Sequence, residues 1–146
     1  MRRYRLGFVW QGTALFALVM LPNILWEVFL SGDVLHRPSA TPGLDMAMAV
    51  CQWLFVAALC LMKNRGAGRL TPKGLMGPAG ALALYWGCWA LYFGGVTGWP
   101  VLLGLTVFPC AAFLLFAVER RNWIAFIPAA CFSVLHLFHF WSNYMT

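Results

Sequence analysis

Charged side chains are scarce in this sequence of 146 residues: Asp, Glu, Lys and Arg together make up 10% of it, against about 25% in an ordinary soluble domain. Only 4 residues are acidic and 10 are basic, which gives a formal net charge of +6. Hydrophobic residues make up 62%, and one domain of this length cannot bury so much apolar surface in water. The composition excludes disordered, collagen-like and soluble nucleic-acid-binding proteins. It predicts a single transmembrane domain over residues 1–146.

Motifs for nucleotide-driven or nucleophilic chemistry are also missing. The sequence has no P-loop, no Gly-x-Ser-x-Gly, no His-Glu-x-x-His, no pair of intramembrane aspartates and no Cys-x-x-Cys. The 5 cysteines all fall in apolar stretches, where they are interpreted as small packing residues: Cys51, Cys60, Cys88, Cys110 and Cys131. These absences argue against an enzyme and against a disulfide framework, and they leave the cofactor unknown.

Long uncharged runs mark the membrane-spanning segments. The runs 6–26, 46–62, 74–118 and 122–146 contain no Asp, Glu, Lys or Arg. A helix crosses the hydrocarbon core with about 20 residues, but the run 74–118 would measure ~68 Å as one helix. It must fold back, and three glycines and a proline between Gly94 and Pro100 mark the turn. We predict an all-α bundle of five transmembrane helices, at about 8–30, 45–63, 77–95, 100–119 and 122–144.

Four spans and one re-entrant segment form the alternative, and charge placement favours five. With five spans, nine of the ten basic residues lie on one side: Arg2, Arg3, Arg5, Lys63, Arg65, Arg69, Lys73, Arg120 and Arg121. The far side holds Arg37 with Asp33 and Asp45. Basic loops face the cytoplasm, so we expect the N-terminus inside and the C-terminus outside, in a bacterial inner membrane. Anionic lipid then accounts for the net charge without nucleic acid.

The basic N-terminus and the apolar stretch behind it are interpreted as an uncleaved first helix. The apolar stretch is long for a signal peptide, and no small-x-small cleavage site follows it. Residues 31–43 and 64–78 are expected to form loops, because proline, glycine and charged residues cluster in them.

Small residues and prolines suggest how the helices pack. Small residues repeat along one face of the third helix, which predicts close packing on that face: Ala79, Ala83, Gly87, Ala90 and Gly94. A similar stripe of Ala125, Ala129 and Ser133 leads to His136 on the fifth helix and turns that histidine toward protein. Pro22 should kink the first helix and free the carbonyl of Leu18.

Polar residues inside the spans mark the candidate site, because such groups are costly in a membrane. Asn23 and Glu27 share a face of the first helix, and His136 and His139 share one on the fifth. Topology places these four and Gln52 at one depth near the outer surface. We predict an outward-facing pocket with aromatic walls, in which Glu27 pairs with a histidine. Its ligand-binding residues are Asn23, Trp26, Glu27, Gln52, Trp89, Tyr92, His136 and His139.

In outline the chain, with its 8 tryptophans, resembles the tryptophan-rich sensory (translocator) proteins. These have about this length and five helices, and they are also rich in tryptophan and basic. That resemblance implies a pocket for a flat hydrophobic ligand. Four stretches are similar to small uncharacterised bacterial multi-span membrane proteins, with no activity implied: 21–26, 85–92, 108–109 and 136–144.

Three functions follow as hypotheses. The first is binding of a small, partly hydrophobic ligand in the pocket, for sensing or facilitated passage. The second is an accessory or assembly subunit, whose small-residue faces dock another membrane protein or a second copy. The third is an intramembrane metal or haem protein that uses His136 and His139, since two histidines and a carboxylate are suitable ligands. Apart from Glu119 at the inner end of the fourth helix, no acidic residue lies in the inner half of a span, which argues against proton-coupled transport.

Overall fold

Five long helices make up most of the structure, a computed structural model that describes residues 3–30, 35 and 38–145. Arg2, Asp33 and Arg37 lie outside the described residues, as do residues 31–34 and 36 of the predicted loop 31–43. The elements follow in the order β1 (Tyr4–Leu6), α1 (Trp10–Phe29), α2 (Pro42–Leu61), β2 (Met62–Asn64), α3 (Pro72–Phe93), α4 (Trp99–Glu119), α5 (Trp123–Phe140) and a π-helical turn (Trp141–Met145).

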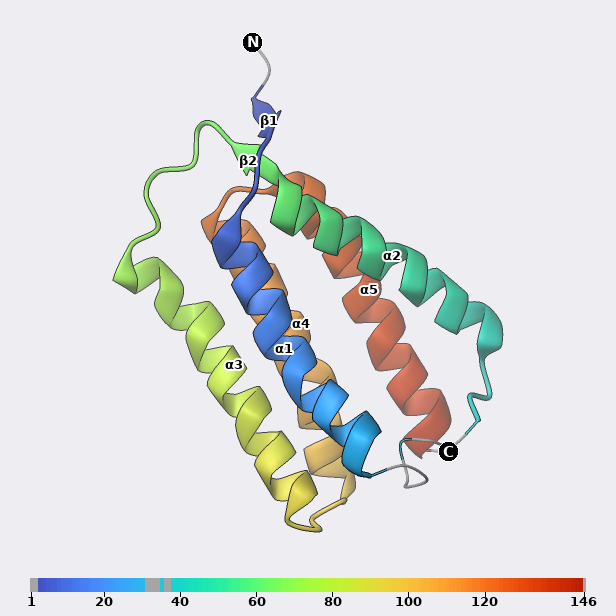
Figure 1. Cartoon of the computed structure of the whole chain (residues 1–146). Helices are drawn as coiled ribbons and strands as arrows, with labels where there is room; N and C mark the ends of the chain where they lie inside the picture. The colour runs from blue at the N-terminus through green and yellow to red at the C-terminus, as the bar shows by residue number, and fades with distance from the viewer. Residues whose placement is uncertain (1–2, 31–34, 36–37, 146) are drawn as a thin grey trace.

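The helices form two closely packed pairs with α1 laid across them. α3 packs along α4, α2 packs along α5, and α4 and α5 join the pairs (Figure 1). α1 lies in front of α4, between α3 on one side and α2 on the other, and makes far fewer contacts than the other helices. The core is built mainly by α4, the most buried helix, whose Ala112 and Ala117 are fully inaccessible.

Four of the described helices are long and apolar enough to cross a membrane: α1, α2, α4 and α5 with its π-helical turn. The chain is therefore an all-α, multi-pass membrane protein. α3 has 22 residues and runs beside α4, but its Gly, Trp and Tyr residues make it less apolar. Side chains such as Trp53 (74% exposed) and Val134 (68%) face outward, as lipid-facing residues do. The fifth span and the orientation stay predictions.

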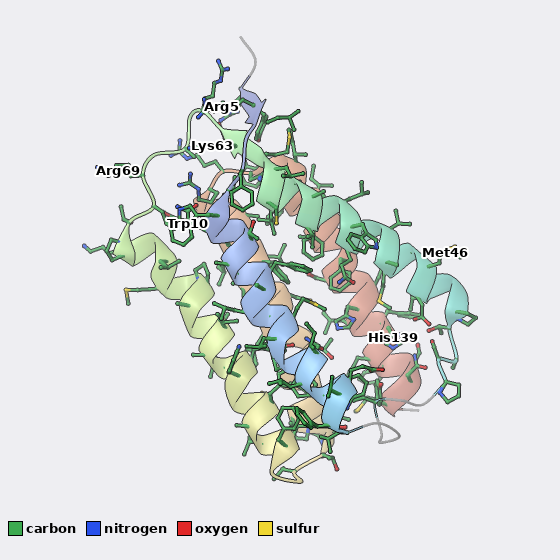
Figure 2. All side chains as sticks on the ribbon, in the orientation of Figure 1. Arg5, Trp10, Met46, Lys63, Arg69 and His139 are labelled. Atoms are coloured by element: carbon green, nitrogen blue, oxygen red, sulfur yellow. The ribbon has the colours of Figure 1, made fainter. Side chains whose placement is uncertain are left out.

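All the basic residues that the structure describes lie at one end of the bundle. Strands β1 and β2 pair there antiparallel, with Arg5 opposite Lys63, and the Arg120 guanidinium donates to the Gly68 carbonyl (2.9 Å). Figure 2 shows Arg5, Lys63 and Arg69 at this end, and Met46 and His139 toward the other. The common location of the positive charge is as predicted. The strand pair was not predicted, because three-residue strands carry too little periodicity.

Buried asparagines hold this basic end together. The Asn122 side chain, 3% exposed, donates to the carbonyls of Ala58 (2.9 Å) and Met62 (3.1 Å) and accepts from the Ala125 N–H. Asn122 therefore satisfies the last carbonyls of α2 and the first turn of α5 at once. Asn64 donates in the same way to the Arg121 carbonyl (2.7 Å).

Two boundaries differ from the prediction. α3 begins at Pro72 rather than near 77, because Thr71 caps the helix by accepting from the Gly74 N–H (3.1 Å) and proline suits the first helical position. The expected loop 64–78 is thus too long, and Pro78 lies inside α3. α2 begins at Pro42 rather than near 45. The turn between α3 and α4 is as predicted, with Gly95 in the left-handed region (φ +89°).

The predicted packing face of α3 is wrong. Its small residues all lie on the exposed side: Ala79, Ala83, Gly87, Ala90 and Gly94. The face turned inward carries Tyr85, Trp89 and Tyr92, each at most 3% exposed. The physical reason is that the Tyr85 hydroxyl finds in the Val19 carbonyl of α1 an acceptor that hydrocarbon cannot offer. On α5 the predicted stripe is confirmed, since Ala125, Ala129 and Ser133 are buried.

The closest approach of α1 to α2 gives a test of this packing. A Cβ added at Gly12 would lie 2.5 Å from the Leu59 carbonyl oxygen, whereas one at Gly87 would meet nothing within 4 Å. We expect Gly12→Ala to destabilise the protein by about 1–3 kcal/mol. Gly87→Ala should be neutral or stabilising by up to about 1 kcal/mol, because alanine is the better helix former. Thermal unfolding of both variants in the same detergent measures the difference, and equal midpoints would contradict the close approach.

Candidate ligand pocket

Pro22 breaks the hydrogen bonding of α1 where α3 can replace it. Proline has no N–H to give to the carbonyl four residues earlier, and the Leu18 carbonyl instead accepts from Trp86 Nε1 (3.0 Å). The Val19 carbonyl accepts from the Tyr85 hydroxyl (3.0 Å). The expectation that Pro22 frees the Leu18 carbonyl is thereby confirmed. The structure adds its partner, the Trp86 indole.

The Asn23 side chain of α1 takes part in the same contact between α1 and α3. Its Nδ2 donates to the Val19 carbonyl (2.8 Å) and to the Tyr85 hydroxyl (2.6 Å). Tyr85 is thus a site residue that the sequence reasoning missed. The available signal was its place beside Trp86 on the third predicted helix, since both residues are aromatic with polar ends.

Two adjoining cavities lie beside Asn23. The first has a volume of about 210 Å³ and reaches from Gln52 to Phe16, near the middle of α1. The second has a volume of about 220 Å³ and lies toward the end away from the basic residues. They adjoin because Asn23, Leu105 and His136 line both. Six of the eight predicted site residues line one or both cavities: Asn23, Trp26, Gln52, Trp89, His136 and His139.

The other two predicted residues lie elsewhere. Glu27 is exposed on α1 and lines neither cavity. Tyr92 is buried and packs edge-on against Trp89, with ring centroids 5.5 Å apart. It therefore supports the wall of the second cavity from behind rather than forming it.

Two buried nitrogen atoms at the cavities have no hydrogen-bond partner among the described residues. They are Nδ1 of His136 and Nε1 of Trp89, whose ring meets Tyr85 edge-on without offering it a well-aligned hydrogen bond. His136 stacks on Phe132, with ring centroids 5.1 Å apart and planes 20° apart. Leaving such groups unsatisfied in an apolar interior is costly. A molecule with hydrogen-bonding groups would remove that cost.

Asp45 supplies the carboxylate beside His139. Its Oδ1 lies 2.9 Å from His139 Nδ1, within ion-pair distance although not aligned as a hydrogen bond. The sequence reasoning had placed Asp45 among the outer charges and expected a histidine pair at Glu27. The early start of α2 explains the contact, because it puts Asp45 in the first turn of α2, beside the end of α5.

His139 also anchors a polar network at this end of the bundle. Asn143 Nδ2 lies 3.4 Å from His139 Nδ1 and 3.4 Å from Thr41 Oγ1, and its Oδ1 accepts from the Ala40 N–H (2.8 Å). A third hollow of about 350 Å³ borders this network and is rimmed by the exposed residues Pro38 and Ala40. It shares Leu35, His139 and Tyr144 with the second cavity. The hollows thus follow one another from the surface to the middle of α1.

The two histidines do not belong to a larger group of metal ligands among the described residues. The described residues form no group of three or more His, Cys, Asp or Glu side chains that could hold a metal ion. His136 and His139 stack nearly parallel, with ring centroids 6.4 Å apart and planes 11° apart. The geometry is that of an aromatic wall.

No family model, no curated protein and no solved structure matches this chain. The resemblance to the tryptophan-rich sensory proteins therefore rests on outline alone, and the site must be judged from its own geometry.

A double-mutant cycle tests the contact that positions Asn23. We expect Asn23→Ala and Tyr85→Phe to couple by about 0.6 kcal/mol and up to ~1.7 kcal/mol, the range measured for hydrogen bonds between membrane helices. Unfolding of the two single variants and the double variant in mixed micelles gives the coupling. As a control, Asn23→Ala with Trp53→Phe should be additive within about 0.5 kcal/mol, because Trp53 points away from the bundle. Additivity of the Asn23 and Tyr85 changes would show that the hydrogen bond contributes nothing.

Proposed function

We propose that this chain is a five-span inner-membrane protein, with its N-terminus inside, that binds a small, planar, partly hydrophobic ligand in the cavities around His136. The observation that carries the proposal is the buried Nδ1 of His136, which has no partner among the described residues and lies where the two cavities meet. The ligand would supply a hydrogen-bonding group to this atom.

The walls favour an aromatic ligand. Trp26, Trp89 and Phe132 offer ring faces and edges around His136, and aromatic rings attract one another in stacked or edge-on arrangements. Asn23 and Gln52 add amide groups, as expected of a mostly apolar pocket with a few polar groups that orient the ligand. A ligand entering through the hollow beside Asn143 would meet His139 first. Sensing and facilitated passage would both begin with binding of this ligand.

Indole and 1-methylindole provide a pair of probes with the same ring system, in which 1-methylindole has a methyl group in place of the N–H donor. We expect the protein in nanodiscs to bind indole about tenfold more tightly, since one hydrogen bond to a buried group is worth about 1–1.5 kcal/mol. His136→Phe keeps the ring and removes the acceptor, so it should reduce the ratio of the two dissociation constants to about one. Isothermal titration calorimetry measures both constants.

Val134→Phe is the control for that experiment, since Val134 lies on the outer face of the same helix. It should leave the tenfold ratio intact. Binding of neither probe beyond partition into empty nanodiscs, or a ratio unchanged by His136→Phe, would overturn the proposed pocket.

The exposed small-residue face of α3 favours a second candidate, an accessory subunit that docks another membrane protein. Small residues on an outer face let a partner helix approach closely, and Gly80 and Gly87 meet nothing within 4 Å.

A bulky substitution on that face separates the two candidates. Gly87→Leu should reduce the size of the native complex, as seen by native gel electrophoresis of membranes solubilised in mild detergent. It should leave indole binding unchanged, because Gly87 lines none of the hollows around His136. Val134→Leu is the control on α5. A native complex of unchanged size with Gly87→Leu would argue against docking on α3.

A further inference from the structure

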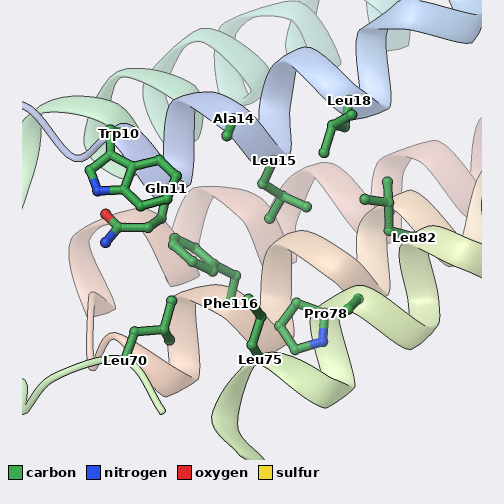
Figure 3. A pocket seen from close by; sticks show the side chains of 11 residues that line it. Trp10, Gln11, Ala14, Leu15, Leu18, Leu70, Leu75, Pro78, Leu82 and Phe116 are labelled. Carbon is green, nitrogen blue, oxygen red and sulfur yellow. The ribbon is translucent and has the colours of Figure 1, made fainter. Parts of the chain in front are cut away.

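A separate apolar groove lies between α1 and α3, toward the basic end of the bundle. It has a volume of about 360 Å³, and Figure 3 shows its lining side chains, from Trp10 and Leu70 at one end to Leu18 and Leu82 at the other. Its floor is buried and includes Leu15 and Phe116. It shares no lining residue with the hollows around His136.

The groove is open along its length on the side of the bundle. Its rims are exposed: Trp10 is 64% exposed, and Leu18 and Leu75 are each 43% exposed. Gln11 is the one polar residue among the side chains that line it, and Figure 3 shows its amide beside Trp10 at the basic end. An elongated apolar molecule entering from the bilayer would therefore find a polar contact at one end only.

Positive charge surrounds that end. Leu70 in the groove directly follows Arg69, and Lys73 lies two residues before Leu75. Arg5 and Lys63 face each other across the strand pair at the same end, where Figure 2 shows them with Trp10 and Arg69. Against these cations the described part of this end carries a single acidic side chain, Glu119. The groove thus combines an apolar channel with a cationic mouth.

We propose that the groove binds one anionic phospholipid, with an acyl chain along α1 between Trp10 and Leu18 and the headgroup at Gln11, Arg69 and Lys73. Basic sites between membrane helices select anionic headgroups in this way. The Trp10 ring lies at the depth where the acyl chains meet the headgroups, as tryptophan does in other membrane proteins. The bound lipid fills the space between α1 and α3.

Filling the groove from its rim tests the proposal. Ala79 lines the groove, whereas Ala83, one turn further along α3 and also exposed, lines none of the hollows described above. The protein is reconstituted in nanodiscs of equal parts phosphatidylglycerol and phosphatidylcholine with identical acyl chains, then released into mild detergent. Native mass spectrometry counts the retained lipids. The unaltered protein and Ala83→Phe should retain one phosphatidylglycerol, and Ala79→Phe should lower that occupancy at least fivefold.

The headgroup is tested by Arg69→Gln with Lys73→Gln. Removing a cation near a membrane surface weakens attraction of an anionic lipid about fivefold, so the retained lipid should lose its preference for phosphatidylglycerol. If Ala79→Phe unfolds the protein, Ala14→Phe replaces it as the test. This variant fills the groove from α1 and should lower the occupancy to the same extent. Equal retention of the two lipids by the unaltered protein overturns the proposal. The proposal is also overturned if Ala83→Phe loses as much lipid as Ala79→Phe.

Discussion

The structure depends on one set of hydrogen bonds, those that Tyr85 and Trp86 of α3 give to the carbonyls of Val19 and Leu18 on α1. α1 packs against its neighbours less closely than any other helix, so apolar contact alone holds it weakly. In a bilayer, where lipid is as apolar as a helix surface, polar contacts carry a larger part of helix association. Pro22 creates the unsatisfied carbonyl, and α3 satisfies it. The loose fit of α1 also explains why cavities lie on both of its sides.

The large features of this fold could be predicted because hydrophobicity and charge determine them over many residues. A run of about 20 uncharged residues is long enough to cross a membrane, and the glycines before Pro100 favour a turn. The basic residues then gather at one end because alternate helix ends must meet there. The buried stripe that leads from Ala125 to His136 was predictable for the same reason, since helical periodicity is regular.

The details of the site depend on single contacts, which periodicity does not reveal. Either face of α3 could have packed inward: small residues favour close approach, and aromatic residues favour burial of their polar ends. The hydroxyl of Tyr85 decides this, because its partner is the Val19 carbonyl of another helix. In the same way, a start of α2 three residues early brought Asp45 to His139. Glu27, the most conspicuous acidic residue in a predicted span, lies on the exposed surface instead.

The proline contact also sets the register of α1 against α3. A slide of α1 by one turn, about 5.4 Å, would carry the Leu18 carbonyl, which Pro22 leaves free within the helix, away from Trp86 and leave the indole N–H without that acceptor. Pro22 is the one proline in α1, so no neighbouring turn offers a second carbonyl freed in this way. Pro22 thus favours one register of α1 against α3, whereas apolar contact alone distinguishes poorly between neighbouring registers.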